Sequence, residues 1–108
     1  MAVMSSRRIR AVRAARMRAA SPTMVVHALC SDSEDGGGLT IVANRAIGGA
    51  VVRNRAKRRL RAAARRARLP AGADLVVDAR SDAVRAPFTT LHRDLERLTT
   101  RAAERARR

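Results

Sequence analysis

One stretch of this sequence carries an unusual density of cationic side chains. Six Lys or Arg residues fall within positions 53–61, and no Asp or Glu lies between Asp35 and Asp74. Like charges at this density repel one another, so a folded domain tolerates them best beside a polyanion that neutralises them. The usual polyanion is a nucleic-acid backbone, whose phosphates are contacted by Arg and Lys. The chemistry that this stretch predicts is phosphate binding.

The residues next to these cations could also help to bind an anion. Asn54 stands between two arginines, and Gly48 and Gly49 precede the stretch. Asn is unfavourable in mid-helix, so we expect Asn54 in a first helical turn, where its amide caps free N–H groups or donates to a phosphate. Glycine permits close approach of a ligand, and a helix start attracts anions. A solvated basic face with an incidental Asn is the alternative.

The composition of the whole chain narrows the function. The 108 residues include 24 Lys and Arg against nine Asp and Glu, for a net charge of +15. Lys57 is the only lysine; arginine grips phosphate through paired donors, although GC-rich coding also favours it. Phe88 is the only Phe, Tyr or Trp, which argues against stacking platforms for unpaired bases. A single cysteine predicts a reducing, cytoplasmic compartment, and no apolar run is long enough for a membrane span.

Other candidate sites are weaker. His27 and Cys30 lack the companions of a zinc motif, so no metal site is expected. For His27 the sequence favours two roles equally: a half-buried residue of a strand, or a ring that contacts RNA. The glycines at 36–38 predict a flexible turn rather than a phosphate loop. The basic start at 1–20 has the composition of an organellar transit peptide, but a basic helix of the domain explains the same residues.

Hydrophobic spacing predicts the elements that position the cations. We expect one domain over 1–108, an α/β (α+β) two-layer sandwich in the order αββαβα, with possible fraying at 1–6 and 104–108. The expected elements are a helix over 5–20, strands over 23–29 and 39–43 paired as a hairpin, a central helix from about 52, a strand over 74–79 and a helix from about 87. The strand–helix–strand order predicts a crossover that lays two strands side by side.

The central helix divides into two faces. Its apolar residues recur at helical spacing and predict a narrow packed stripe: Val52, Ala56, Leu60, Ala63 and Ala67. Arginines and Lys57 cover the remaining surface, including Arg55, Arg58, Arg59 and Arg66. In the last helix the apolar residues at the same spacing are Phe88, Leu91, Leu95, Leu98 and Ala102.

The segment from Gly49 to Arg58, GAVVRNRAKR, resembles the signature of the bacterial ribonuclease P protein subunit. Looser likeness extends to residues 24–27, 69–77 and 91–98. The resemblance implies a small basic partner of a catalytic RNA that removes the 5′ leader from precursor tRNA at low magnesium. It also implies a left-handed βαβ crossover. Catalytic residues are not expected in the protein, Mg²⁺ is expected mainly on the RNA and substrate, and neither a membrane nor an obligatory protein partner is expected.

The resemblance also carries over site residues. Positions implied to bind the RNA subunit are Arg45, Arg53, Asn54, Arg55, Lys57, Arg58, Arg61 and Arg65. A groove between the sheet and the first helix is implied to hold the leader, and its candidates are Ile9, Val12, Arg13, Val25 and His27. Ile9 and Arg13 stand where the family usually has phenylalanines, which puts leader stacking in doubt.

Charge alone leaves other functions open. A general nucleic-acid-binding module, such as a ribosomal or chromosome-associated protein, would bind any duplex with similar salt dependence. A self-sufficient nuclease is disfavoured, because the few acids are not paired for two-metal cleavage.

Overall fold

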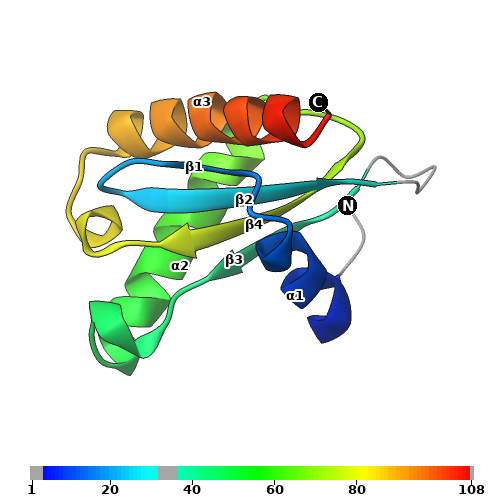
Figure 1. Ribbon diagram of the computed structural model, residues 1–108. Coiled ribbons are helices and arrows are strands. Elements are labelled where there is room, and N and C mark those ends of the chain that lie inside the picture. Colours follow the sequence, from blue (N-terminus) through cyan, green and yellow to red (C-terminus); the bar gives the residue numbers. More distant parts are fainter. Residues whose placement is uncertain (1–3, 32–36, 108) are drawn as a thin grey trace.

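The computed structural model describes residues 4–31 and 37–107, which form a four-stranded sheet with helices on both faces (Figure 1). The elements in chain order are α1 (Ser6–Ala14), β1 (Arg18–Ala20), β2 (Met24–Cys30), β3 (Leu39–Val42), the short 3₁₀ helix η1 (Arg45–Ile47), α2 (Ala50–Arg66), β4 (Ala73–Ala79), the 3₁₀ helix η2 (Ser81–Val84) and α3 (Phe88–Ala106). The predicted order αββαβα is present, with the short strand β1 added between α1 and β2.

The strand order is β1-β2-β4-β3, and it corrects the predicted hairpin. β2 pairs antiparallel with β1 and β4, whereas β3 pairs parallel with β4. β2 and β3 are therefore not neighbours, because β4 lies between them. Residues 73–77 of β4 are all buried, and a strand buried on both faces belongs in the interior of a sheet. The predicted side-by-side placement of the strands flanking the central helix is confirmed.

The crossover from β3 to β4 is left-handed. In Figure 1 both strands run leftward, α2 passes behind the sheet, and β4 lies above β3. Nearly all crossovers of this kind are right-handed. The structure thus has the exceptional handedness that the family resemblance implied.

The main core lies between the sheet and the helices α2 and α3. The predicted stripe of α2 is buried at Ala56, Leu60 and Ala63, and Val52 and Ala67 at its ends are half-buried. α3 contributes Leu91, Leu95, Leu98 and Ala102, all with no exposed surface. Helix α1 covers the opposite face of the sheet (Figure 1).

The first helix is shorter than predicted. The sequence predicts a helix over 5–20, but α1 ends at Ala14 and residues 18–20 form β1. Arg16 has φ 57°, a left-handed conformation that stops a helix, and the chain then turns back along β2. Arg18 lies directly opposite His27 in this pairing. Strand pairing with β2 overrides the helical propensity of this segment.

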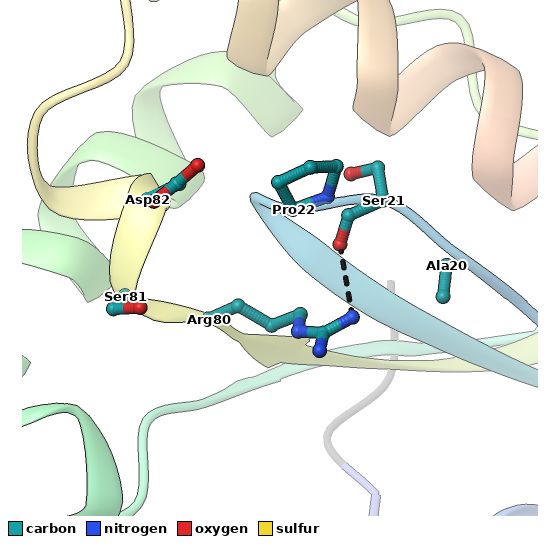
Figure 2. A pocket seen from close by; sticks show the side chains of 6 residues that line it. All are labelled: Ala20, Ser21, Pro22, Arg80, Ser81 and Asp82. Carbon is teal, nitrogen blue, oxygen red and sulfur yellow. Dashed lines mark hydrogen bonds between the residues drawn. The ribbon is translucent and has the colours of Figure 1, made fainter.

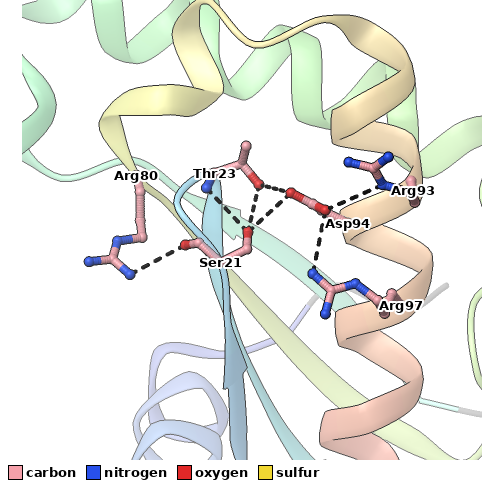
Figure 3. A network of polar contacts seen from close by, with 6 residues as sticks. All are labelled: Ser21, Thr23, Arg80, Arg93, Asp94 and Arg97. Carbon is pink, nitrogen blue, oxygen red and sulfur yellow. Dashed lines mark hydrogen bonds and ion pairs between the residues drawn. The ribbon is translucent and has the colours of Figure 1, made fainter.

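A buried polar network fixes the turn between β1 and β2 to α3 (Figure 3). The Asp94 carboxylate accepts hydrogen bonds from Thr23 Oγ1 at 2.8 Å and Ser21 Oγ at 3.2 Å. Arg97 Nη2 lies 3.6 Å from the other carboxylate oxygen. Buried polar groups are stable when they are paired in this way, so the network holds the turn in one conformation.

The C-terminal helix continues through Ala106, and two arginines tie its end to the rest of the domain. Arg105 donates to the carbonyl of Arg18, and Arg107 donates to that of Ala71. Arg108 lies outside the described residues. Among the described residues, no helix is long and apolar enough to span a membrane.

Candidate nucleic-acid interface

The start of α2 is set by the two glycines that precede it. Gly48 has φ 141°, and a Cβ there would lie 3.1 Å from the side chain of Val52. Gly49 is the N-cap, so the helix begins at Ala50. Asn54 is consequently the fifth helical residue, and the prediction that it lies in the first turn and caps the helix is wrong. Asn54 is exposed, so its amide lies at the surface of the helix instead.

The cations of α2 form a surface without acids. Arg55, Arg58, Arg61 and Arg65 are exposed, and Arg53 and Lys57 are half-buried. In the part of the chain that the structure describes, no cation of α2 takes part in an ion pair. The α2 surface, defined by Arg53, Asn54, Arg55, Lys57, Arg58, Arg61 and Arg65, therefore presents its charge to an external anion. Arg45 of η1, also predicted to bind RNA, is exposed immediately before this helix.

Two arginines of α2 are tied to the backbone of η2. Arg59 donates from Nη1 to the carbonyl of Ala83 at 2.7 Å and from Nη2 to that of Ala86. Arg55 Nε donates to the carbonyl of Val84 at 3.3 Å, a bond that leaves its terminal nitrogens for a ligand. Arg59 was included in the cationic face by its spacing, but the structure uses it to hold η2 against α2.

Arg53 has a different environment from its neighbours. Its Nε is buried and has no hydrogen-bond partner among the described residues. Buried donors in proteins are nearly always paired, and leaving one unpaired costs free energy. In this conformation the unpaired Nε–H of Arg53 is a cost in free energy, and its burial shields it from an external phosphate.

The candidates for the leader groove lie on the side of the sheet that α1 covers. Val12 has no exposed surface and packs α1 onto the sheet, whereas Ile9 and Val25 are half-buried. Arg13 binds the Asp78 carboxylate through both Nη2 and Nε. His27 Nε2 lies 3.2 Å from the same carboxylate. The structure thus brings two predicted groove residues together around an acid.

The electrostatics of His27 follow from this setting. Burial lowers the pKa of His27 below 6.5, and the nearby charges of Arg13 and Arg18 act in the same direction. The Asp78 carboxylate opposes them and raises that pKa, but burial dominates. The ring is therefore mostly neutral at pH 7, and it acts there as a hydrogen-bonding group rather than a cation.

A second acid holds the start of α1. Arg8 Nε binds Asp74, and Arg8 Nη2 donates to the Cys30 carbonyl at 2.9 Å. Asp74 also accepts from the backbone N–H of Gly38 at 2.8 Å. Sequence reasoning missed these acids as partners. The alternation of β4 places residues 74 and 78 on one face, but nothing local shows that α1 covers it.

An open hollow lies at the end of the sheet, where β4 leads into η2 (Figure 2). Its volume is about 500 Å³, and it is lined by Ala20, Ser21, Pro22, Arg80, Ser81 and Asp82. Arg80 Nη1 donates to the carbonyl of Ser21 at 3.3 Å. No pattern in the sequence indicates this hollow, because Arg80 stands apart from the cationic stretch.

Within the described residues, no group of three or more His, Cys, Asp or Glu side chains is arranged to hold a metal ion. The expectation that Mg²⁺ is held mainly by RNA and substrate stays a prediction.

The chain is similar to proteins of one family over almost its whole length. The family model described as Ribonuclease P matches residues 2–103. A ribonuclease P protein component from Nocardioides sp. is 43% identical over 88 residues, covering 78% of this chain and 75% of that protein. One from Symbiobacterium thermophilum is 42% identical over 85 residues, covering 77% and 74%.

Solved structures agree with the sequence relatives. The RNase P protein of Thermotoga maritima matches with a TM-score of 0.74 at 26% identity, over 90% of this chain and 97% of that one. The RNase P protein of Staphylococcus aureus matches with a TM-score of 0.72 at 22% identity, over 94% of both chains. The second likeness concerns the fold alone.

Proposed function

Because this chain belongs to the ribonuclease P protein family, we propose that it is the RNA-binding subunit of that ribonucleoprotein endoribonuclease. In this role it binds the catalytic RNA and assists removal of the 5′ leader from precursor tRNA. The observation that carries the proposal is the α2 surface, whose exposed cations face solvent with no acid paired to them among the described residues.

The α2 surface suits a folded RNA. Each guanidinium on it can donate paired hydrogen bonds to phosphate oxygens. Every phosphate neutralised releases counterions, so affinity should fall steeply with salt. Bonds from Arg55 and Arg59 to the carbonyls of η2 hold this part of α2 in place before RNA arrives. Such pre-ordering reduces the entropy lost on binding.

The face under α1 is the proposed place for the leader. Ile9 and Val25 offer half-buried apolar surface there, and His27 and Arg13 offer polar groups. Arg13 is already bound to Asp78, so a leader phosphate competes with that carboxylate. With no Phe, Tyr or Trp on this face, contact with sugar and phosphate is favoured over base stacking.

The reaction itself is proposed to reside in the RNA. Mg²⁺ would supply the activation of water and the stabilisation of the leaving oxygen there. The protein's cations reduce repulsion between RNA strands, which lowers the magnesium concentration needed for a compact complex. Its residues therefore bind and orient RNA rather than transfer protons.

The direct test is cleavage of a 5′-extended precursor tRNA by the cognate catalytic RNA at low magnesium, with and without the protein. We expect cleavage to be stimulated only when both components are present. An excess of unrelated duplex RNA should compete poorly. Tight, indiscriminate binding without stimulation would instead favour a general nucleic-acid-binding module.

A further inference from the structure

The two edges of the sheet are treated differently by the rest of the protein. At one edge lies β1, where the carbonyl of Arg18 accepts a hydrogen bond from the side chain of Arg105 in α3. At the other edge lies β3, which pairs with β4 on one side only (Figure 1). In the part of the chain that the structure describes, no further strand pairs with β3. The edge formed by β3 is therefore open.

The open edge of β3 leaves the backbone groups of two residues unpaired. The carbonyl of Gly38 accepts a hydrogen bond from the N–H of Leu75 at 2.9 Å, so residue 38 directs its backbone groups toward β4. Successive residues of a strand direct their N–H and C=O groups to opposite edges, so those of Thr40 also point toward β4. Those of Leu39 and Ile41 point away from the sheet, where no described residue bonds to them.

Nothing in the sequence of β3 protects this edge. Natural edge strands are commonly guarded by Lys, Pro or another charged residue, because unpaired backbone groups attract a further strand. β3 reads Leu-Thr-Ile-Val, and each of its four residues is only half-buried. Such an edge can accept an extended peptide as an added strand, with main-chain hydrogen bonds supplying the affinity.

A hollow with a cationic rim runs beside the same edge. Its volume is about 360 Å³, and it is lined by Leu39, Thr40, Ile41, Arg61, Ala64 and Arg65. Leu39, Ile41 and Ala64 pack against the core and give the hollow an apolar lining. Arg61 and Arg65 are exposed and have no acidic partner among the described residues. Their charge selects a peptide that carries carboxylates.

We propose that the open edge of β3 binds an extended acidic segment of a partner protein as an added strand. Backbone groups of Leu39 and Ile41 pair with the segment, and Arg61 and Arg65 pair with its carboxylates. A second copy of this chain is a poorer occupant, because two paired β3 edges would bring like charges together and the net charge of +15 opposes association. A segment bound here also covers part of the α2 surface and hinders RNA binding, a consequence that rests on the proposed function.

The test uses the full protein without RNA and a fluorescent peptide of about eight residues that alternate Glu and Val, a length typical of a strand. Amide hydrogen exchange, followed by NMR, reports the pairing. We expect the N–H groups of Leu39 and Ile41 to become protected when the peptide binds. The same peptide with a fully N-methylated backbone keeps every carboxylate but cannot donate to β3. It should bind about tenfold more weakly, because its hydrogen bonds are lost.

A pair of double variants tests the cationic rim. Arg61→Gln with Arg65→Gln should weaken peptide binding about fivefold, the loss expected for two exposed ion pairs. The charge-matched control is Arg85→Gln with Arg101→Gln, because both arginines are exposed and neither lines the hollow. This control should leave peptide affinity nearly unchanged. Thermal unfolding checks that each variant is folded, and the comparison of the two peptides uses the wild type and needs no variant.

The outcomes decide between the possible modes of binding. Equal affinity for the two peptides, or no protection of Leu39 and Ile41, would overturn the added strand. Equal losses in the two double variants would show that net charge, and not the rim, selects the peptide. A dimer in sedimentation that protects Leu39 and Ile41 without peptide would assign the edge to a second copy and overturn the acidic partner.

These results do not depend on the proposed function, because RNA is absent from the measurements. The competition is tested separately by adding the Glu–Val peptide to the complex of the protein with the cognate catalytic RNA. We expect the peptide to weaken RNA binding, and the N-methylated peptide to do so less. Undiminished RNA binding in the presence of bound peptide would contradict the competition and leave the peptide site in place.

Discussion

Helices α1 and α2 are both rich in arginine, but the structure uses those arginines differently. In α1, Arg8 and Arg13 bind the carboxylates of Asp74 and Asp78 across the gap to β4. In α2, no cation has an acidic partner among the described residues. The same residue type therefore fastens one helix to the sheet and leaves the other charged toward solvent. What distinguishes the two helices is the element that faces them, not their own composition.

The largest predicted effect concerns the packed side of α2. Leu60 is fully buried beneath the cationic surface, so Leu60→Ala should lower the free energy of unfolding by about 2–5 kcal/mol. Val51→Ala is the matched control, because Val51 is 81% exposed on the same helix. Chemical denaturation measures both. A near-neutral Leu60→Ala would mean that α2 is packed by another face.

The next prediction separates two arginines within α2. Arg61→Ala should weaken binding of the cognate RNA by about 1–3 kcal/mol and leave the unfolding free energy nearly unchanged. Arg59→Ala should instead destabilise the fold by about 1–3 kcal/mol, since the carbonyls of Ala83 and Ala86 lose their donor. Filter binding and denaturation, run on both variants, report the two quantities. Equal effects of the two variants on both quantities would contradict the assignment.

A smaller effect is expected at the ion pairs of α1. Asp78→Asn removes the partner of Arg13, whose side chain is 40% exposed, so the loss of stability should be about 1 kcal/mol or less. The pKa of His27 should fall further, because Asp78 raises it. NMR titration of the His27 ring measures that shift. Asp82→Asn is the control with the same change in charge, and an equal shift there would show that proximity to Asp78 is not the cause.

The smallest effect is a dependence of stability on pH. Burial holds the pKa of folded His27 below 6.5, so the unfolded chain takes up a proton first as the pH falls. The lowered pKa of His27 contributes to the free energy of unfolding in full above about pH 6.5. That contribution should be lost as the pH falls through the pKa of the folded protein. His27→Gln should remove that part of the slope, and His92→Gln should not. An equal slope of unfolding free energy against pH in the wild type and in His27→Gln would contradict the assignment of this pH dependence to His27.

Local patterns predicted part of this structure well. The periodicity of apolar residues located the buried face of α2 and the leucines of α3, because a helix repeats every 3.6 residues whatever surrounds it. The start of α2 was misjudged by two residues, which displaced Asn54 from its predicted place. The hairpin was wrong because strand neighbours are chosen by tertiary burial, and β4 inserts between β2 and β3.

The candidate site also has a part that could be predicted from the sequence and a part that could not. The α2 surface was predictable, because both its charge and its lack of acids are visible along the chain. The bonds of Arg13 and His27 to Asp78 were not, since they depend on how α1 is rotated on the sheet. Arg80 was missed for a related reason: its hollow is formed by a turn almost sixty residues away in sequence.

The most direct measurement compares affinity for the cognate catalytic RNA among three proteins. These are the wild type, a variant with Arg58, Arg61 and Arg65 changed to Gln, and a variant of equal charge with Arg85, Arg93 and Arg101, which are exposed outside the α2 surface, changed to Gln. If α2 is the RNA-binding surface, only the first variant should lose affinity strongly, and its salt slope should decrease by about 2.7 for three duplex phosphates. Equal losses in both variants would show that net charge, and not the α2 surface, governs binding.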